Sequence, residues 1–180
     1  GIKGSSVMLI FNKKLAVSPI TTHISLNQVS KQLNADKIVE KVIVINNFYK
    51  KFLKKKVKFG ILGLNPHNYS TGKLSEEKTI ISKAIKRLKN LKIKVVGPIS
   101  ADSSFMISNK YNFDVIIGMY HDQVLTPFKA LYQFDAINIT LGLPYIRISP
   151  DHGVANNLVG KKEASHLSLI ESIKFFNLIK

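Results

Sequence analysis

The amino-acid sequence predicts an α/β fold, in which buried strands alternate with helices. Short runs rich in Val and Ile recur along the 180 residues, and segments with apolar residues at helical spacing lie between them. Turn-forming stretches such as Gly63-Leu64-Asn65-Pro66 and Gly97-Pro98 follow several of these runs. The sequence contains no internal repeat, and its length suits one domain, or one and a fraction, with a substantial core.

A hairpin, two helices and a buried strand are expected in the first part of the chain. The hairpin turns at Asn12-Lys13, and Ser25-Leu26-Asn27-Gln28 has the spacing of a capping box at the start of a helix. Pro66 lacks an N–H, so it ends the strand before it and leaves His67 in a loop. The elements expected here are strands at 7–11 and 15–20, a helix from 25, a helix at 35–53 and a strand at 57–64.

Strands and helices continue to alternate in the second part. Ser75-Glu76-Glu77 opens a helix with acids in its first turn, where the helix dipole favours negative charge. Gly97-Pro98 closes the next strand, and Pro127 is tolerated in the first turn of a short helix. The expected elements are a helix from 75 to 88, a strand at 93–96, a loop or the start of a helix at 101–105, a strand at 114–119, a helix at 124–130, strands at 136–141 and 145–148, and a helix at 164–179.

Composition excludes several classes of protein. A net charge of +16 attracts phosphate at low salt, but only Lys50-Lys51 and Lys54-Lys55-Lys56 form a dense run, and neither an aromatic ladder nor a known nucleic-acid motif accompanies it. We therefore expect a solvated surface and no nucleic-acid partner. No apolar stretch approaches the ~20 residues that span a membrane. The absence of cysteine excludes disulfides and thiolate sites and fits a cytoplasmic protein.

A polar cluster follows the strand at 114–119, in the stretch Met119-Tyr120-His121-Asp122-Gln123. Open α/β sheets bind ligands at the carboxyl ends of their strands, so this position suits a site. His23 and His67 follow strand-like runs in the same way. Three neutral imidazoles suit a divalent metal such as Zn²⁺. The alternative is that each is a loop histidine bonded to the backbone, and the residues alone leave both interpretations open.

Further polar residues downstream are candidates for substrate binding. Arg147 offers a fixed fork for carboxylate or phosphate. Lys129 offers a point charge or a proton-transfer group, although in so lysine-rich a chain it could be a surface residue. Asn138 lies inside an apolar strand and needs hydrogen-bond partners. Asp102 could orient a histidine or cap a helix. Asp151-His152-Gly153 could bind an adenosine moiety or simply form a turn, and neither G-x-G-x-x-G nor a P-loop is present.

Taken together, these motifs resemble the 4-hydroxythreonine-4-phosphate dehydrogenases, the NAD-dependent enzymes of pyridoxal phosphate biosynthesis. The match runs in consistent order from about residue 5 to the C-terminus. The stretches that carry it are Thr21-Thr22-His23, Gly63-Leu64-Asn65-Pro66-His67, Gly97-Pro98 with Ala101-Asp102, Met119-Tyr120-His121-Asp122-Gln123, Asn138-Ile139-Thr140-Leu141-Gly142-Leu143-Pro144 with Arg147, and Asp151-His152-Gly153. One departure is Asn68-Tyr69-Ser70, where the family usually has Ala-Gly-Glu.

The resemblance implies a three-layer α/β/α fold like that of isocitrate and isopropylmalate dehydrogenases. It implies that His23, His67 and His121 hold one divalent metal cation (Zn, Mg or Co) in a site shared across a homodimer. Residues 1–130 would form the metal-binding and dimerisation domain, and residues 131–180 the C-terminal part of the cofactor-binding domain.

The same resemblance assigns roles to the remaining candidates. It implies that Lys129, Asn138 and Arg147 bind a phosphorylated substrate, with Lys129 and Asp102 as catalytic residues and Lys129 the proton-transfer group. The turn Asp151-His152-Gly153 would contact the adenosine of NAD.

The reaction that the resemblance implies is the NAD-dependent oxidation of 4-phosphooxy-L-threonine to 2-amino-3-oxo-4-phosphooxybutanoate, which then loses CO₂ to give 3-amino-2-oxopropyl phosphate. One alternative is a paralogue that oxidises threonate or erythronate phosphate. The other is an inactive remnant that serves as a dimerisation or binding module. Because family members carry an additional N-terminal segment, we expect this sequence to be the C-terminal portion and nearly inactive alone, which normal NADH formation by the 180-residue chain would contradict.

Overall fold

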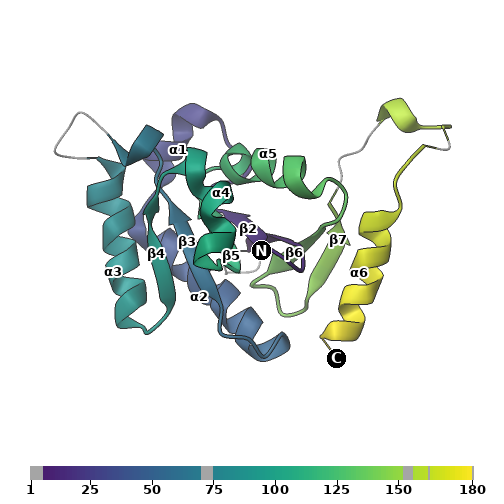
Figure 1. Ribbon diagram of the computed structural model, residues 1–180, viewed down its shortest axis with the longest axis horizontal. Coiled ribbons are helices and arrows are strands. Elements are labelled where there is room, and N and C mark those ends of the chain that lie inside the picture. The colour runs from purple at the N-terminus through teal and green to yellow at the C-terminus, as the bar shows by residue number, and fades with distance from the viewer. Residues whose placement is uncertain (1–5, 70–74, 152–155, 162, 180) are drawn as a thin grey trace.

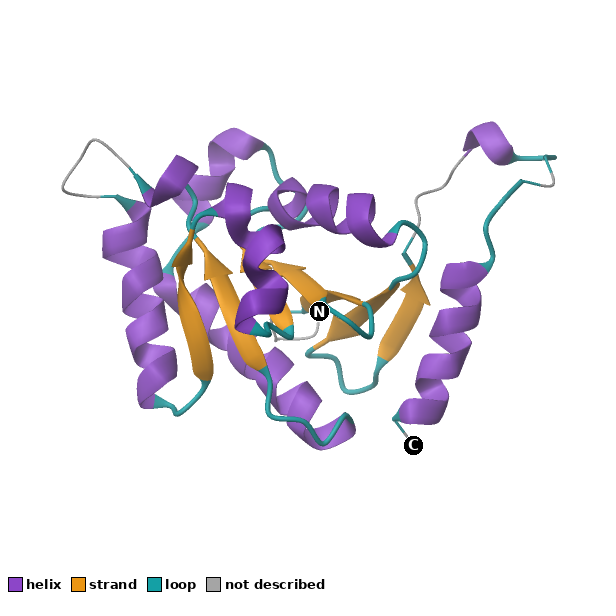
Figure 2. Ribbon diagram, in the orientation of Figure 1, coloured by secondary structure: helices purple, strands orange, loops and turns teal. Residues whose placement is uncertain are grey.

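One mixed sheet forms the centre of the molecule (Figures 1 and 2). The computed structural model describes residues 6–69, 75–151, 156–161 and 163–179. Within these residues the sheet has seven strands in the order β4-β3-β5-β2-β1-β6-β7. Their bounds are Val7–Phe11 (β1), Ala16–Pro19 (β2), Lys58–Leu62 (β3), Lys94–Ile99 (β4), Val115–Gly118 (β5), Ile137–Leu141 (β6) and Arg147–Pro150 (β7).

The sheet is parallel on one side and antiparallel on the other. Strands β4, β3, β5 and β2 run parallel to one another, whereas β1, β6 and β7 alternate in direction. The carboxyl ends of β3, β5 and β2 therefore meet at one edge. His67, His121 and His23 follow these three strands, so the topology brings the predicted ligands to a common edge.

Helices cover both faces of the sheet. Helices α2, α3 and α6 share one apolar core with residues such as Leu9 and Ile117, and α4 and α5 share a second core around Ile10 and Ile116. Figure 1 shows α3 beside β4 and α6 beside β7, at opposite ends. The bounds are Leu26–Gln32 (α1), Ala35–Phe52 (α2), Ser82–Asn90 (α3), Ala101–Tyr111 (α4), His121–Tyr132 (α5) and Leu167–Leu178 (α6), with short turns of helix at Pro66–Asn68 (η1), Glu77–Ile81 (η2) and Asn156–Leu158 (η3). The predicted three-layer α/β/α fold is confirmed.

The predictions for individual elements were mostly correct, with two errors at prolines. Strand β4 does not stop at Gly97-Pro98 but continues to Ile99 through a cis peptide bond between these two residues. Helix α5 begins at His121 rather than at Val124, which puts Pro127 in its second turn. Burial of Val124 and Phe128 against the sheet offsets the one N–H that Pro127 lacks.

Two expected helix starts differ in detail. Ser25 precedes α1 as predicted, but its hydroxyl donates to Asn27 Oδ1 at 2.7 Å, so the capping box is wrong. Glu77 lies in the first turn of the helical segment as predicted, but this turn is the π-helical η2, which leads directly into α3, and Glu77 is buried there. The predicted role was an interaction with the helix dipole. A buried carboxylate also needs hydrogen-bond donors.

The proposed division of the chain at residue 130 falls in the last turn of α5. Beyond it, β6 pairs with β1 along its whole length, so both parts contribute to the same sheet. The separate roles predicted for the two parts stay predictions. Among the described helices, none has the length and apolar character that crossing a bilayer requires.

Candidate functional site

His23 and His121 lie side by side at the edge where β2 and β5 end. These strands pair in register up to Pro19 and Gly118, so the turns that follow them start at the same level. The ring centroids of the two histidines are 5.6 Å apart, and the rings are tilted by 42°. With metal–nitrogen distances of about 2 Å, two imidazoles at such a separation can bind one cation.

A carboxylate contacts one of the two ring nitrogens of His121. His121 Nδ1 lies 2.6 Å from Asp122 Oδ1. A carboxylate on one ring nitrogen orients the imidazole and leaves the other nitrogen for a ligand, an arrangement common among metal-binding histidines. Tyr120 is extended and α5 starts at His121, so the backbone turns at this residue.

The histidine pair borders a pocket of about 450 Å³, a size typical of small-molecule sites. Five predicted site residues from four segments line it: His23, His121, Lys129, Asn138 and Asp151. Both His121 and Lys129 belong to α5. Lys129 comes eight positions after His121, which corresponds to about 12 Å along a helix axis. The pocket therefore has imidazoles at one end and an ammonium group at the other.

Lys129 contacts the residue that follows β7. Its Nζ lies 3.3 Å from Asp151 Oδ1 and donates to the Asp151 carbonyl at 3.2 Å. Asp151 is buried, and its backbone N–H donates to Ser168 Oγ at 2.7 Å. These contacts join α5, β7 and α6 at the end of the pocket away from the histidines.

Asn138 lines the pocket and has a buried side-chain acceptor. Among the residues that the structure describes, its buried Oδ1 has no hydrogen-bond partner. An unsatisfied buried acceptor costs about 1–3 kcal/mol. A ligand that donates a hydrogen bond here would remove that cost, so this atom indicates a ligand with a hydroxyl or ammonium group.

Arg147 lies outside this pocket, on the same face of the sheet. Its Nη1 donates to Thr140 Oγ1 at 3.1 Å. Thr140 in β6 pairs with Arg147 in β7 and with Met8 in β1, and Met8 lines the pocket. The Arg147 guanidinium is therefore beside the rim of the pocket. His152 and Gly153, the remaining predicted cofactor residues, lie outside the described residues.

His67 is separate from the histidine pair. It lies in η1 with a left-handed backbone (φ 53°), and its side chain is 74% exposed. Its Nδ1 is 3.4 Å from Asp102 Oδ2, and Asp102 in turn accepts a hydrogen bond from the Ser100 hydroxyl, which lowers the pKa of Asp102. Within the described residues no three His, Cys, Asp or Glu side chains group around one point. That all three histidines share a metal stays a prediction that needs a second copy of the chain.

Two residues that the sequence analysis missed support the turn that carries His23. The hydroxyl of Thr21 donates to the Met119 carbonyl at 2.8 Å, which joins the ends of β2 and β5. The buried Lys41 donates from Nζ to the Ile20 carbonyl at 2.8 Å. Burial, and then the charge of Lys37, lower the pKa of Lys41. The adjacent Thr pair was a signal for Thr21, but nothing in the helical pattern of α2 distinguished Lys41.

A third missed residue, Glu77, supports the loop that carries His67. Its Oε1 accepts hydrogen bonds from the backbone N–H groups of Leu64 and Asn65 at 2.9 and 2.8 Å. Burial acts to raise the pKa of Glu77, but the donors from Asn65 and Leu64 outweigh it, so that the pKa is below the usual value. An Asn-Pro loop has backbone N–H groups that need acceptors, and this was the only available signal for Glu77.

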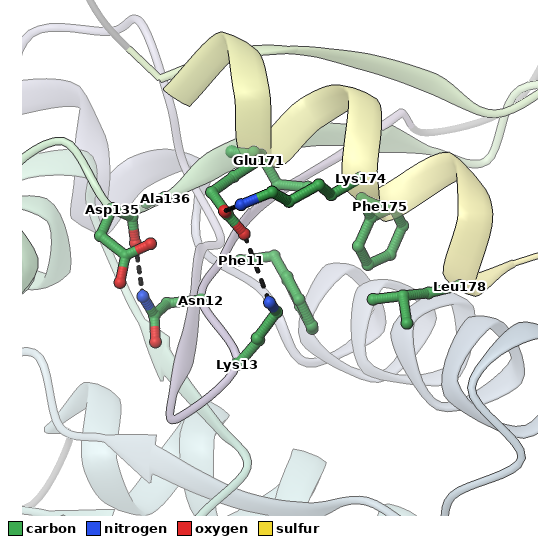
Figure 3. A pocket seen from close by; sticks show the side chains of 10 residues that line it. Phe11, Asn12, Lys13, Asp135, Ala136, Glu171, Lys174, Phe175 and Leu178 are labelled. Atoms are coloured by element: carbon green, nitrogen blue, oxygen red, sulfur yellow. Dashed lines mark hydrogen bonds and ion pairs between the residues drawn. The ribbon is translucent and has the colours of Figure 1, made fainter. Parts of the chain in front are cut away.

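A second cavity lies between the β1–β2 hairpin and α6 (Figure 3). Lys13 and Lys174 both pair with Glu171 there, at 3.4 and 2.7 Å, and the Asn12 amide donates to the Asp135 carbonyl. Its volume is about 20 Å³, which is little more than one water molecule occupies. We therefore assign it a structural role in docking α6.

The chain matches one protein family model and several curated proteins along most of its length. Residues 2–176 match the family model described as pyridoxal phosphate biosynthetic protein PdxA. The chain is 46% identical over 176 residues to a 4-hydroxythreonine-4-phosphate dehydrogenase of Sulfurihydrogenibium sp., with 96% of this chain and 54% of the relative covered. It is 41% identical over 170 residues to the enzyme of that name from Bradyrhizobium diazoefficiens, with 93% and 49% covered.

A solved structure agrees with these matches. The 4-hydroxythreonine-4-phosphate dehydrogenase of Klebsiella pneumoniae superposes with a TM-score of 0.80 at 34% identity, and the superposition covers 94% of this chain and 52% of that one. The chain thus spans about half the length of the curated relatives that it matches.

Proposed function

The chain belongs to the PdxA family of pyridoxal phosphate biosynthetic proteins, and from that premise we propose that it serves the NAD- and metal-dependent oxidation of 4-phosphooxy-L-threonine. The product would be 2-amino-3-oxo-4-phosphooxybutanoate, which then loses CO₂. The observation that supports this most is the pocket in which His23 and His121 face each other while Lys129 lies at the far end.

His23 and His121 are the proposed metal ligands. The donor set fits such an ion, because both side chains are imidazoles and Asp122 contacts Nδ1 of His121, which leaves Nε2 for a ligand. Nitrogen ligands suit Zn or Co better than Mg. When bound, the cation would stabilise negative charge on the substrate oxygen, and the nicotinamide would supply a hydride acceptor.

His67 is the proposed third ligand, contributed by a second copy of the chain in a homodimer. Two imidazoles are fewer than the three protein ligands that catalytic zinc sites typically have. His67 is exposed and lies apart from the pair, so it is free to reach another molecule. Asp102, 3.4 Å from its ring, is proposed to orient it.

Lys129, Asn138 and Arg147 are the proposed substrate contacts. Asn138 Oδ1 can accept a hydrogen bond from a substrate hydroxyl or ammonium group. Lys129 can bind an anionic group as a point charge and transfer a proton, and Arg147 can swing toward a phosphate at the rim. Asp151, which holds Lys129, is proposed to face the cofactor together with His152 and Gly153.

Cobalt and substrate binding together test the proposal. The metal-free chain is titrated with Co²⁺ while its visible absorption is recorded, and calorimetry then measures the affinity for 4-phosphooxy-L-threonine with and without metal. We expect a cobalt spectrum that His23→Ala and His121→Ala abolish, and substrate binding that is tighter with metal. His166→Ala is the matched control, because His166 is exposed at the start of α6, outside the pocket.

Equal cobalt binding by the His23→Ala/His121→Ala double variant would overturn the metal site. Tighter binding of threonate or erythronate phosphate than of 4-phosphooxy-L-threonine would replace the proposed substrate with that of a paralogue. If no phosphorylated hydroxy acid bound, the alternative of an inactive binding module would be favoured.

A further inference from the structure

Gln123 joins the two loops that lead to His121 and His67. Its Oε1 accepts a hydrogen bond from the backbone N–H of Met119 at 2.6 Å, and its Nε2 donates to the carbonyl of Gly63 at 2.8 Å. Met119 and Gly63 directly follow the neighbouring parallel strands β5 and β3. We propose that Gln123 is a positioning residue for the metal site, whose carboxamide sets the spacing between the strand end that presents His121 and the one that presents His67. The inference rests on the proposed metal function.

A carboxamide is the group that this position requires. The N–H of Met119 can only donate and the carbonyl of Gly63 can only accept, so the orientation of the Gln123 amide follows from its two partners. A carboxylate in its place would accept from Met119 but could not donate to Gly63. An apolar side chain of equal length would do neither, and two backbone groups would lose their partners.

The backbone on both sides of the amide is closely packed. A Cβ atom built on Gly118 would lie 2.5 Å from Val124 Cγ1 and 3.2 Å from Gln123 Oε1, and one on Gly63 would overlap the Asn68 side chain. Glycine is therefore needed at position 118, where β5 ends against Val124 and close to the Gln123 amide. Such packing fixes the amide within its two hydrogen bonds.

The link through Gln123 belongs to a continuous set of contacts across three strand ends. Thr21 holds the Met119 carbonyl from the β2 side, while Gln123 holds the Met119 N–H. Beyond Gly63, Glu77 holds the next two backbone N–H groups. The segments before His23, His121 and His67 are thus connected by side chains, none of which would itself touch the metal.

A simpler role for Gln123 is to stabilise the start of α5. It occupies the third residue of that helix, where a Gln side chain often accepts from a backbone N–H just before the helix. That role uses only the bond to Met119. Gly63 is 60 residues from Gln123 in the sequence, so the hydrogen bond to its carbonyl contributes nothing to helix capping. The two roles therefore make different predictions for variants.

Two variants of Gln123 and one control separate these roles. Gln123→Met removes both hydrogen bonds at nearly constant length, and Gln123→Glu keeps the acceptor for Met119 but removes the donor to Gly63. Asn34→Ala is the control, because it removes a different helix cap, the hydrogen bond from the Lys37 N–H at the start of α2. Cobalt affinity, the visible cobalt spectrum and the melting temperature are measured for each.

We expect Gln123→Met to weaken cobalt binding about 10- to 100-fold, as loss of an outer contact to a metal site typically does, and to change the spectrum. Gln123→Glu should also bind cobalt more weakly, although its added negative charge attracts the cation, and it should lower the melting temperature less than Gln123→Met because it keeps the hydrogen bond from Met119. Asn34→Ala should lower the melting temperature and leave cobalt affinity and spectrum unchanged.

Failure of the inference is distinguishable from failure of the proposed function. If the unchanged chain binds cobalt through His23 and His121, but Gln123→Glu binds it equally with the same spectrum, Gln123 is only a helix cap and the inference is overturned. The inference is also overturned if Asn34→Ala loses as much cobalt affinity as Gln123→Met. If the unchanged chain binds no cobalt, the metal function itself is overturned, and this inference with it.

Discussion

The His23/His121 corner and the His67 corner have the same sequence context but different structures. All three histidines follow parallel strands that are neighbours in the sheet. The ring centroids of His23 and His121 are 5.6 Å apart, and both residues border the pocket. His67 instead lies in a left-handed turn beside Asp102, with its side chain 74% exposed. A strand-end position therefore brings a side chain to the correct edge of a sheet, but the turn after the strand decides where the side chain is directed.

Mixing variants of the two corners should give the largest effect. His121→Ala and His67→Ala should each lose tight cobalt binding. If His67 serves the partner's site, a mixture of the two variants contains heterodimers with one intact site. About a quarter of the sites should then recover after random exchange of copies between symmetric dimers, which the cobalt spectrum measures.

The control for this experiment is a mixture of His23→Ala with His121→Ala. Both changes affect the same corner, so no heterodimer of these variants has an intact pair and no recovery is expected. Recovery in neither mixture, although each single variant lost cobalt, would mean that His67 does not act across a dimer.

The Lys129 end of the pocket should affect substrate binding rather than metal binding. Lys129→Ala should weaken the binding of 4-phosphooxy-L-threonine by about 1.5–3 kcal/mol, the usual value of a hydrogen bond to a charged group, as measured by calorimetry. Lys83→Ala on the exposed side of α3 is the matched control and should have no effect. An equal loss in both variants would indicate general charge attraction instead of a specific contact.

Glu77 should stabilise the His67 corner in a pH-dependent way. Because its pKa is lowered in the folded chain, the stabilisation is complete above the unfolded value of about 4.3 and is lost as the pH falls through the lower folded value. Glu77→Gln should therefore lower the free energy of unfolding by about 1–3 kcal/mol at pH 7, and by less at pH 4. Urea unfolding at both pH values measures this, and a difference independent of pH would contradict it.

Asp102 should have the smallest effect on stability. Its carboxylate and the His67 ring are both largely exposed, and exposed ion pairs contribute little. Asp102→Asn should leave the melting temperature unchanged in calorimetric scans. A clear decrease would mean that the Asp102–His67 contact holds the loop together, in contrast to the role in orienting His67 that we propose.

The sequence predicted the layers of the fold and the polar residues of the pocket for a common reason. Apolar periodicity identifies strands and helices, and polar residues stand out where such runs end, as at His121, or where they interrupt a run, as at Asn138. The helix over Ala35–Phe52 and the strand Val7–Phe11 were found within one residue for that reason.

The contacts that were not predicted join side chains to backbone groups far away in the sequence. Gln123 reaches Gly63, and Thr21 reaches Met119, across 60 and 98 residues. Which backbone groups lie opposite a side chain depends on the strand order, and local pattern does not contain that order. The same holds for His67, because its distance from the other histidines depends on a turn geometry that the Asn-Pro pair alone does not specify.

Helix α5 carries two of the proposed contacts, and their spacing has a consequence for selectivity. It carries His121 in its first turn and Lys129 in its third, so the interval between the two groups is set by helical geometry and not by a flexible loop. Under the proposed function, we expect a ligand to engage both groups at once. We therefore expect phosphorylated acids with three carbons to bind more weakly than those with four, because they would reach only one of the two groups.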